Sequence, residues 1–341
     1  MTIGIIVNKT RDVGFTLARR LAGAIRARGG KVVLTTGVDT GLSGCPQDLL
    51  PLFVDDRRAL SECDVLICIG GDGTLIKTAR ETYFSGKPLL GVNSGSLGYL
   101  TEVESPQLEA VLDRLFSHDY RIEERMMLAV TRVKWATRTD SGAGDAGSRV
   151  AAHEGGGDAP DGRGNPDAAD APDGRGSPDI ADAQGGADEI VLNELAIVRG
   201  DAPHVVKMKV YVNGALLDVY PGDGILVSTP TGSTAYSLSA GGPVIDPELA
   251  AISIVPICPH VIFSRPVIIS PDKEITIVSA GADGTFPATV SADGFRGPDL
   301  YAGDVIKIRR SEHATRILRF YDDNFYTVLK SKLYNTANRF G

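Results

Sequence analysis

The sequence has few cysteines, no long apolar run and no excess of basic residues, and each shortage excludes a class of protein. Its four cysteines form no Cys-x-x-Cys pair, which argues against a disulfide framework or a zinc site. No apolar run approaches the ~20 residues that span a bilayer, and the short apolar start lacks the basic leader of a signal peptide. Lys and Arg total 35 against 43 Asp and Glu, so nothing suggests a nucleic-acid binder. We therefore expect a cytoplasmic protein with no membrane or nucleic-acid partner.

The 341 residues are enough for two domains, and the first of them has an α/β pattern. Short apolar runs alternate with segments whose apolar residues have helical spacing. The runs predict strands over 3–7, 31–34, 64–69 and 89–92, and the spacing predicts helices over 15–28, 75–83 and 108–117. Such alternation implies a parallel sheet covered on both faces, so residues 1–120 are predicted to form a Rossmann-like domain.

Beyond residue 120 the pattern changes to many short β-rich runs bounded by Gly, Pro, Asn and Asp. These predict a second, mainly antiparallel domain over residues 121–319. The predicted strands cover 127–135, 207–212, 224–228, 267–269, 274–279, 289–292 and 305–309. The terminal segment 320–341, helical or mixed as far as residue 333, is expected to pack back on the first domain.

One segment, Arg138 to Asp188, is rich in Gly, Ala, Asp and Pro and has almost no large apolar residues. It contains a tandem repeat that starts at Ala159 and again at Ala171. Such a segment cannot bury enough apolar surface to offset its ordering entropy, so we expect a disordered insert. Calcium-binding Asp-x-Asp repeats are the alternative, but the spacing fits them poorly.

The first motif that could take part in binding or catalysis is Gly70-Gly71-Asp72-Gly73-Thr74, which follows one predicted strand and opens a predicted helix. This is the sheet edge where open α/β sheets bind ligands, and glycines and a free helix start both suit a phosphate. A carboxylate repels phosphate, so Asp72 makes sense if it accepts a proton or holds a metal or a sugar hydroxyl. The alternative is a tight turn with Asp72 as the helix N-cap.

Two short polar motifs lie at other predicted strand ends. Residues 93–100 form a second glycine-rich loop after the next strand, at the same edge of the sheet. Asn193-Glu194 sets an amide beside a carboxylate, a pair that can hold a ribose diol or an adenine amine. A simple turn is the alternative for this pair.

The longest motif, residues 222–243, runs from a predicted strand into a dense series of hydroxyls and small residues. Hydroxyls and loop N–H groups can bind phosphate oxygens, and small residues permit the close approach of a flat ring. Helix capping explains one or two of these hydroxyls but not the whole run. Farther on, Asp293-Gly294 is most simply a hairpin turn.

Together these motifs resemble those of the NAD kinase family, in the order in which that family carries them. The resemblance covers nearly the whole chain except the insert. Diacylglycerol and sphingosine kinases share Gly-Gly-Asp-Gly-Thr, whereas the stretch over residues 228–236 is more particular to NAD kinases. The resemblance implies a Rossmann-like domain joined to a β-sandwich, usually in a homo-oligomer such as a dimer or tetramer.

The resemblance also implies transfer of the γ-phosphoryl group of ATP, or of polyphosphate, to the 2′-hydroxyl of the adenosine ribose of NAD. It implies Mg²⁺ or a similar ion bound with ATP, and it assigns no metal ligand to the protein. By position, Asp72 would be the proton acceptor and Lys77 would suit a phosphate. Asp223 would face the nicotinamide end of NAD, perhaps across a subunit interface. The other implied substrate-binding residues are Gly73, Asn193, Glu194, His204, Thr234, Ala235, Tyr236, Ser237 and Ser239.

Two alternatives stay open at this point. A diacylglycerol-type lipid kinase would need an apolar acceptor channel and a lipid-docking surface, and the sequence has no amphipathic basic stretch that would serve. A non-catalytic NADP-binding sensor could keep the same loops without needing a base.

Overall fold

The computed structural model describes the chain apart from residues 9, 36–44, 94–97, 134–187, 201–204, 262, 281–286, 322–323 and 338–341. Almost all of the predicted insert, and the predicted contact residue His204, lie outside the described residues. Asp188, the last residue of the predicted insert, is described and pairs with Arg309. Among the described residues, no helix is long and apolar enough to cross a membrane.

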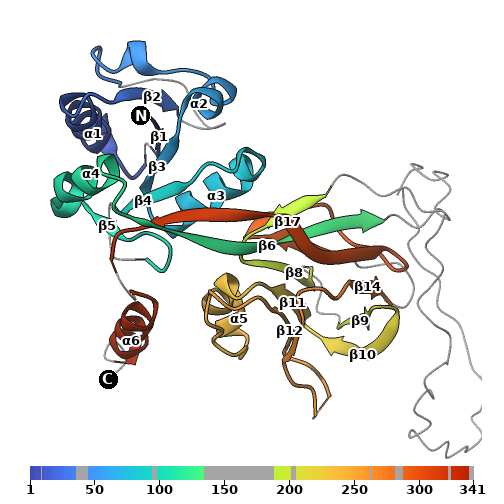
Figure 1. Cartoon of the computed structure of the whole chain (residues 1–341). Helices are drawn as coiled ribbons and strands as arrows, with labels where there is room; N and C mark the ends of the chain where they lie inside the picture. Colours follow the sequence, from blue (N-terminus) through green and yellow to red (C-terminus); the bar gives the residue numbers. More distant parts are fainter. Residues whose placement is uncertain are drawn as a thin grey trace, which may run out of the picture.

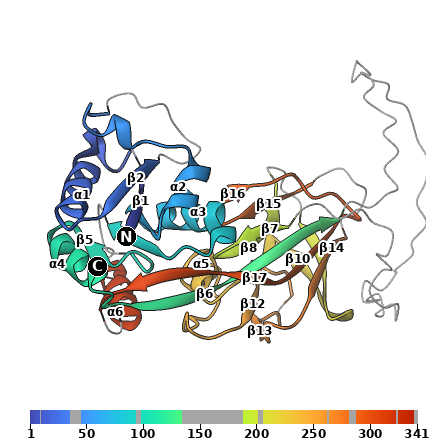
Figure 2. The same cartoon turned by 45° about the horizontal axis from the view of Figure 1, so that its top comes forward.

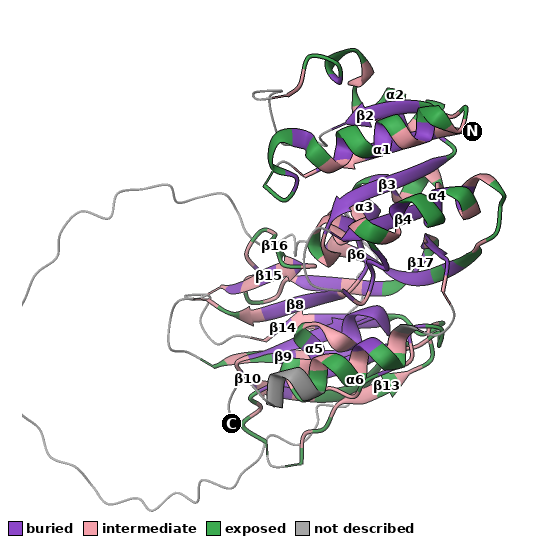
Figure 3. Cartoon of the chain, turned by 90° about the vertical axis from the view of Figure 1, so that its left-hand side faces the viewer, coloured by how far each residue is buried: buried purple, intermediate pink, exposed green. Residues whose placement is uncertain are grey.

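The first part of the chain forms the predicted parallel sheet, with helices on both faces (Figure 1). Its strands, in spatial order, are β4 (Leu89–Asn93), β3 (Val65–Gly70), β1 (Thr2–Val7) and β2 (Lys31–Thr35). Helices α1 (Thr16–Ala27) and α4 (Leu108–Phe116) pack on one face, and α2 (Asp56–Glu62) and α3 (Asp72–Thr82) pack on the other. Every residue of β3 and β4 is buried, as expected for strands covered on both faces (Figure 3).

The second part forms two antiparallel layers, so the predicted combination of a Rossmann-like domain and a β-sandwich is confirmed. One layer has the order β13 (Val267–Ile269), β12 (Ile252–Ile257), β11 (Gly224–Ser228), β8 (Glu194–Arg199), β15 (Ala288–Ala292) and β16 (Phe295–Arg296). The other contains β10 (Ala215–Gly222), β9 (Val206–Val212), β14 (Ile275–Ser279), β17 (Val305–Arg319), β6 (Arg121–Val133) and β7 (Glu189–Val191). Apolar side chains from both layers form one core between them.

Strand β6 begins at Arg121 rather than at residue 127, and β17 continues to Arg319 rather than ending at residue 309; the two strands join the two parts of the molecule (Figure 2). At one end β17 pairs with β14, and at the other Ile317 pairs with Leu89 of β4, so one sheet continues through both parts. The sequence hid this extension because Glu312, Arg316 and Arg319 interrupt the apolar residues in the second half of β17. The division into domains at residue 120 stays a prediction.

The C-terminal segment forms helix α6 (Asn324–Ala337), which contacts both parts of the chain. The ring of Phe325 lies 6.2 Å from the ring of Tyr99, in the loop after β4. The hydroxyl of Tyr326 donates to Asp246, which belongs to the second part. The helix therefore lies where the first sheet meets the loops of the second.

Candidate active site

Asp72 occupies the first position of α3, immediately after the end of β3, and its carboxylate reaches across to the loop that follows β4. It accepts hydrogen bonds from the backbone N–H groups of Tyr99 at 2.7 Å, Leu100 at 3.1 Å and Thr101 at 3.1 Å. The Thr101 hydroxyl adds a fourth bond at 3.1 Å. The N-cap of α3 is Gly71, so the reading of Asp72 as a simple helix cap is wrong.

Gly98 explains how the two glycine-rich loops come so close together. A Cβ atom on Gly98 would lie 1.8 Å from the Oδ1 atom of Asp72, a separation that no folded protein tolerates. Only glycine at this position lets the loop after β4 wrap around the carboxylate. The two motifs at neighbouring strand ends therefore form one unit, as the parallel sheet predicts.

The side chain of Asp293 is fully buried and stabilises the turn at Asn193-Glu194 through hydrogen bonds to its backbone. Asp293 accepts the backbone N–H groups of Leu192 at 2.8 Å, Asn193 at 2.6 Å and Glu194 at 3.1 Å. The predicted hairpin turn is confirmed, since Asp293 and Gly294 have φ values of 50° and 81° between β15 and β16. Its second role, as the support of the Asn193-Glu194 turn, could not be read from the sequence.

Glu194 is a buried carboxylate with an unusual electrostatic setting. Burial, followed by the negative charge of Asp293, raises the pKa of Glu194 to about 7, against the opposing effect of a hydrogen bond from the backbone of Tyr236. Its Oε2 atom has no hydrogen-bond partner among the described residues. A buried acceptor of this kind is costly to leave unpaired, so Glu194 is suited to a ligand that brings a donor.

The hydroxyl-rich stretch folds directly onto this turn, as a short 3-10 helix followed by α5 (Tyr236–Ser239). The hydroxyl of Thr229 donates to the Leu192 carbonyl at 2.6 Å. A Cβ atom on Gly232 would lie 2.2 Å from the Asn193 carbonyl oxygen, so only glycine permits this contact. Several hydroxyls are thus structural, including that of Ser233, which bonds Pro230 and Ile245.

The predicted ligand-binding residues of this stretch differ in exposure. Thr234 and Ala235 are half-buried, and Tyr236 and Ser239 are exposed. Ser237 is buried, and its hydroxyl has no hydrogen-bond partner among the described residues. The stretch therefore offers both an exposed aromatic ring and an unused hydroxyl beside Glu194.

Helix α3 connects the Asp72 end of the site to the Glu194 end. Arg80, eight residues after Asp72 and thus ~12 Å along the helix, donates to the carbonyls of Ile190 at 3.2 Å and Ala292 at 2.8 Å. Its Nε atom lies 3.5 Å from Asp293. One rigid helix therefore sets the separation of the two carboxylates, although neither Arg80 nor Asp293 was predicted as a site residue.

Three predicted residues lie outside this group or at its margin. Gly73 is exposed in the first turn of α3, and Lys77 lies one turn farther on with its Nζ atom 4.0 Å from Glu81. Asp223 precedes β11, whose other end pairs with Glu194, so it lies roughly 16 Å from that residue along the strand. Asp223 instead forms a 3.0 Å ion pair with Arg199.

No cluster of three or more His, Cys, Asp or Glu side chains suited to a metal occurs among the described residues. A magnesium ion is commonly held by one or two carboxylates together with substrate phosphates. The residues present therefore fit a metal that is carried by a nucleotide rather than one caged by the protein.

Comparison with known families and curated proteins matches the chain nearly end to end. Residues 3–120 match the ATP-NAD kinase N-terminal domain, and residues 192–320 match the ATP-NAD kinase C-terminal domain. An NAD kinase of Ruminiclostridium cellulolyticum is 34% identical over 97% of this chain and 97% of its own length. An NAD kinase of Geobacter metallireducens is 36% identical over 79% of this chain and 78% of its own length.

Two solved structures have the same fold. The yeast NADH kinase complexed with NADH has a TM-score of 0.74 at 20% identity, over 98% of this chain and 87% of the yeast chain. An NAD kinase from Archaeoglobus fulgidus in complex with ATP has a TM-score of 0.62 at 19% identity, over 98% of this chain and 99% of the archaeal chain.

Proposed function

The chain belongs to the NAD kinase family and is an enzyme with that activity, and from this premise we propose how its residues phosphorylate the 2′-hydroxyl of the adenosine ribose of NAD. The observation that carries the proposal is the connection of Asp72 to Glu194 through α3 and the Arg80–Asp293 contact. The similarity over both parts of the chain does not favour the lipid-kinase alternative.

In this proposal Asp72 accepts the proton of the ribose hydroxyl. Its Oδ1 atom already accepts three hydrogen bonds, but Oδ2 accepts only the one from Tyr99 among the described residues. A carboxylate oxygen has about two lone-pair sites, so Oδ2 has room for a substrate hydroxyl. The loop fixes the carboxylate before the substrate arrives, which supports catalysis by positioning.

Asn193, Glu194 and the stretch from Thr234 to Ser239 hold the nicotinamide nucleotide in the proposal. The unpartnered oxygen of Glu194 and the unpartnered hydroxyl of Ser237 support this role, because both are buried polar groups that a bound ribose or base can satisfy. The exposed ring of Tyr236 can stack on a flat base.

The phosphoryl donor in the proposal is ATP or polyphosphate, and it lies near the start of α3. The exposed N-terminal turn at Gly73 and the side chain of Lys77 suit phosphate oxygens. A divalent ion such as Mg²⁺, bound together with ATP, would neutralise part of the phosphate charge. Most of the remaining acceleration comes from the orientation of donor and acceptor.

The proposal includes a homo-oligomer, in which Asp223 faces the nicotinamide end of NAD across a subunit interface; His204 is proposed as a further substrate contact. The distance of Asp223 from Glu194 along β11 supports this arrangement. A large apolar side chain, Phe263, is 85% exposed in the connection that follows the Ile257 end of β12, which pairs with the Asp223 end of β11. Light scattering of the wild type and of Phe263→Ser tests this point, and a monomeric wild type would refute it.

The function itself is tested by combining each phosphoryl donor, ATP or polyphosphate, with each acceptor, NAD, NADH or diacylglycerol, and measuring the phosphorylated product. We expect NADP from NAD, and no phosphorylated lipid. Preference for the lipid would exclude the proposed reaction, and binding of NADP without any turnover would favour the sensor. A cytoplasmic location is part of the proposal and is testable by fractionation of the source cells.

A further inference from the structure

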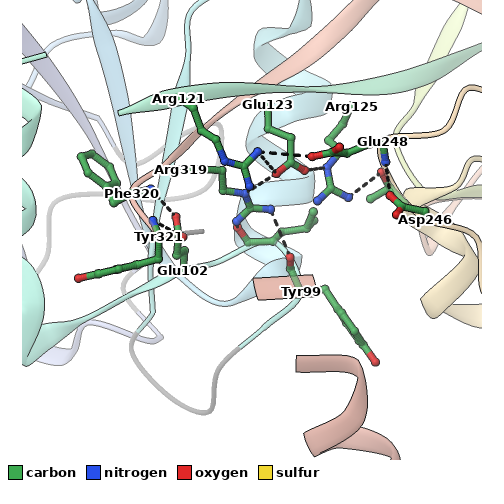
Figure 4. A network of polar contacts seen from close by, with 12 residues as sticks. Tyr99, Glu102, Arg121, Glu123, Arg125, Asp246, Glu248, Arg319, Phe320 and Tyr321 are labelled. Carbon is green, nitrogen blue, oxygen red and sulfur yellow. Dashed lines mark hydrogen bonds and ion pairs between the residues drawn. The ribbon is translucent and has the colours of Figure 1, made fainter. Parts of the chain in front are cut away.

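Three buried charged side chains lie between the Asp72 loop and the hydroxyl-rich stretch (Figure 4). They are Glu123 and Arg125 of β6 and Arg319 at the end of β17, with relative exposures of 7%, 3% and 6%. Glu123 accepts a bond from the Nε atom of Arg319 at 2.8 Å and another from Arg125. The carboxylate of Glu123 is thus shared by two buried arginines on neighbouring strands, and the more exposed Arg121 lies 3.7 Å from it.

Each arginine reaches on to one of the two catalytic loops. Arg319 donates to the carbonyls of Leu100 at 3.0 Å and Tyr99 at 3.4 Å. Those two residues also supply N–H groups that hold Asp72. Arg125 lies 3.4 Å from the hydroxyl of Thr231, in the hydroxyl-rich stretch. A continuous path of polar contacts therefore runs from Asp72 to Thr231, with Glu123 at its centre.

A cavity of about 470 Å³ borders this network and the loop. Its walls include Gly98, Tyr99, Thr101, Glu123 and Arg319. The loop borders open space on this side, although Leu100 is buried in the apolar core behind it. The hydrogen bonds of Arg319 to the loop carbonyls add a constraint on the side of the cavity.

The charges of the network are well matched but costly to bury. Burial by itself raises the pKa of Glu123, but the charges of Arg319 and Arg125 outweigh that effect, and the pKa lies below its usual value. Burial lowers the pKa of Arg125 to about 10, which leaves it charged at neutral pH. Buried ion pairs of this kind contribute little net stability compared with apolar packing, and fixing one specific arrangement is a known use of them.

We propose that Glu123 is a positioning residue for catalysis, which through Arg319 and Arg125 fixes the Asp72 loop relative to the hydroxyl-rich stretch. The inference rests on the proposed role of Asp72 as proton acceptor. In this inference the effect of Glu123 on the reaction passes through Arg319 and the peptide groups of Tyr99 and Leu100.

Glu123→Gln tests the inference, because it keeps the size of the side chain but removes the charge that both arginines share. We expect kcat per folded enzyme to fall by about 10- to 100-fold, as a displaced catalytic group would cause, with KM for NAD and ATP within about 3-fold of wild type. Glu123→Asp, which restores the charge, should recover part of the lost kcat.

Glu124→Gln is the matched control, since Glu124 is the next residue on β6 and forms an exposed 3.7 Å ion pair with Arg316. We expect it to keep wild-type kcat and KM. If Glu123→Gln does not fold, Arg319→Lys replaces it, because lysine keeps the charge but cannot span Glu123 and two carbonyls at once. The same loss of kcat is expected for that variant.

Combination with Asp72→Asn separates positioning from general stability. If Glu123 acts through Asp72, Glu123→Gln should change the residual phosphoryl transfer of Asp72→Asn by less than about 3-fold, measured with radiolabelled ATP. A full multiplicative loss in that background, or an unchanged kcat in folded Glu123→Gln and Arg319→Lys, would overturn the inference. Undiminished turnover of Asp72→Asn alone would refute the proposed role of Asp72 instead.

Discussion

Arg80 and Asp293 meet where the Asp72 helix crosses the second sheet, with the Nε atom of Arg80 3.5 Å from a fully buried Asp293 carboxylate. Arg80 also pairs with Glu189 at 2.7 Å and stacks on the ring of Phe295, 4.8 Å from its centroid. The contact thus joins the helix that begins with Asp72 to the turn that carries Glu194. Its loss should affect both stability and the geometry of the site.

Arg80→Met should lower the free energy of unfolding by about 3 kcal/mol, since it leaves Asp293 buried without a cation. That value is at the lower end for a broken buried pair, because three backbone N–H groups still solvate the carboxylate. Arg296→Met is the control, since the Arg296–Asp299 pair is exposed and should contribute less than ~1 kcal/mol. Urea unfolding of both variants measures the difference, and equal losses would contradict the assigned role.

Asp72→Asn should abolish nearly all formation of NADP while NAD binding is largely kept. The amide oxygen can still accept the bonds of Leu100 and Thr101, whereas the NH2 group replaces the oxygen that accepts from Tyr99, and the amide cannot take the proton of the ribose hydroxyl. Turnover assays combined with calorimetric titration of NAD measure the two effects separately. A variant that binds NAD but turns over at the wild-type rate would remove Asp72 from its proposed role.

Gly98→Ala should inactivate the enzyme by displacing the Asp72 carboxylate, because the added Cβ would stand 1.8 Å from the Oδ1 atom of Asp72. We expect a loss of kcat of at least 10²-fold, as for other ångström-scale displacements of catalytic groups. Gly23→Ala, in α1 with open space at its Cβ position, is the control and should retain full activity. Comparable kcat values for the two variants would show that the Asp72 loop adjusts freely.

The stability of the wild type should depend on pH through Glu194. Its pKa is about 7 in the folded protein, above its ordinary value of 4.5, so between these values the folded state holds a proton that the unfolded chain has lost. The free energy of unfolding of the wild type should therefore fall relative to Glu194→Gln as the pH rises from about 5 to about 7.5, on the order of 2 kcal/mol in total. Urea unfolding across this range measures it, and a difference that does not vary with pH would contradict the burial of an ionisable Glu194.

The elements that the sequence predicted best are strands that are buried on both faces and a helix with a single buried face. Strands β1, β3 and β4 are uniform apolar runs, and α1 places Ala18, Leu21, Ala22 and Ile25 on one buried face, so periodicity alone locates them. β10 was missed because it is an edge strand with four exposed residues at its start. β17 was cut short because its second half pairs with β6 through a register shift and carries charges.

The sequence predicted the motifs of the candidate site but not the residues that hold those motifs in position. Asp72, Asn193, Glu194 and the stretch from Thr234 to Ser239 stand in recognisable sequence contexts, and their assignment as binding residues stays a prediction. Arg80, Glu123 and Arg319 have no such context, and Asp293 indicated only a hairpin turn, because their roles depend on partners about a hundred or more residues away. Long-range pairing of this kind follows from the fold and leaves no local pattern.

The final prediction concerns residues 138–187, which link the neighbouring strands β6 and β7. These strands pair from Leu128–Val191 to Val130–Glu189, so a short linker can replace the segment without moving either strand. The deletion stops before Asp188, because its carboxylate accepts bonds from Thr131 and Arg309. Each doubling of a flexible loop costs only ~0.6 kcal/mol, so we expect unchanged kcat and a melting temperature equal to or slightly above that of the wild type. Loss of activity, or a fall in melting temperature of many degrees, would show that the segment is part of the folded structure.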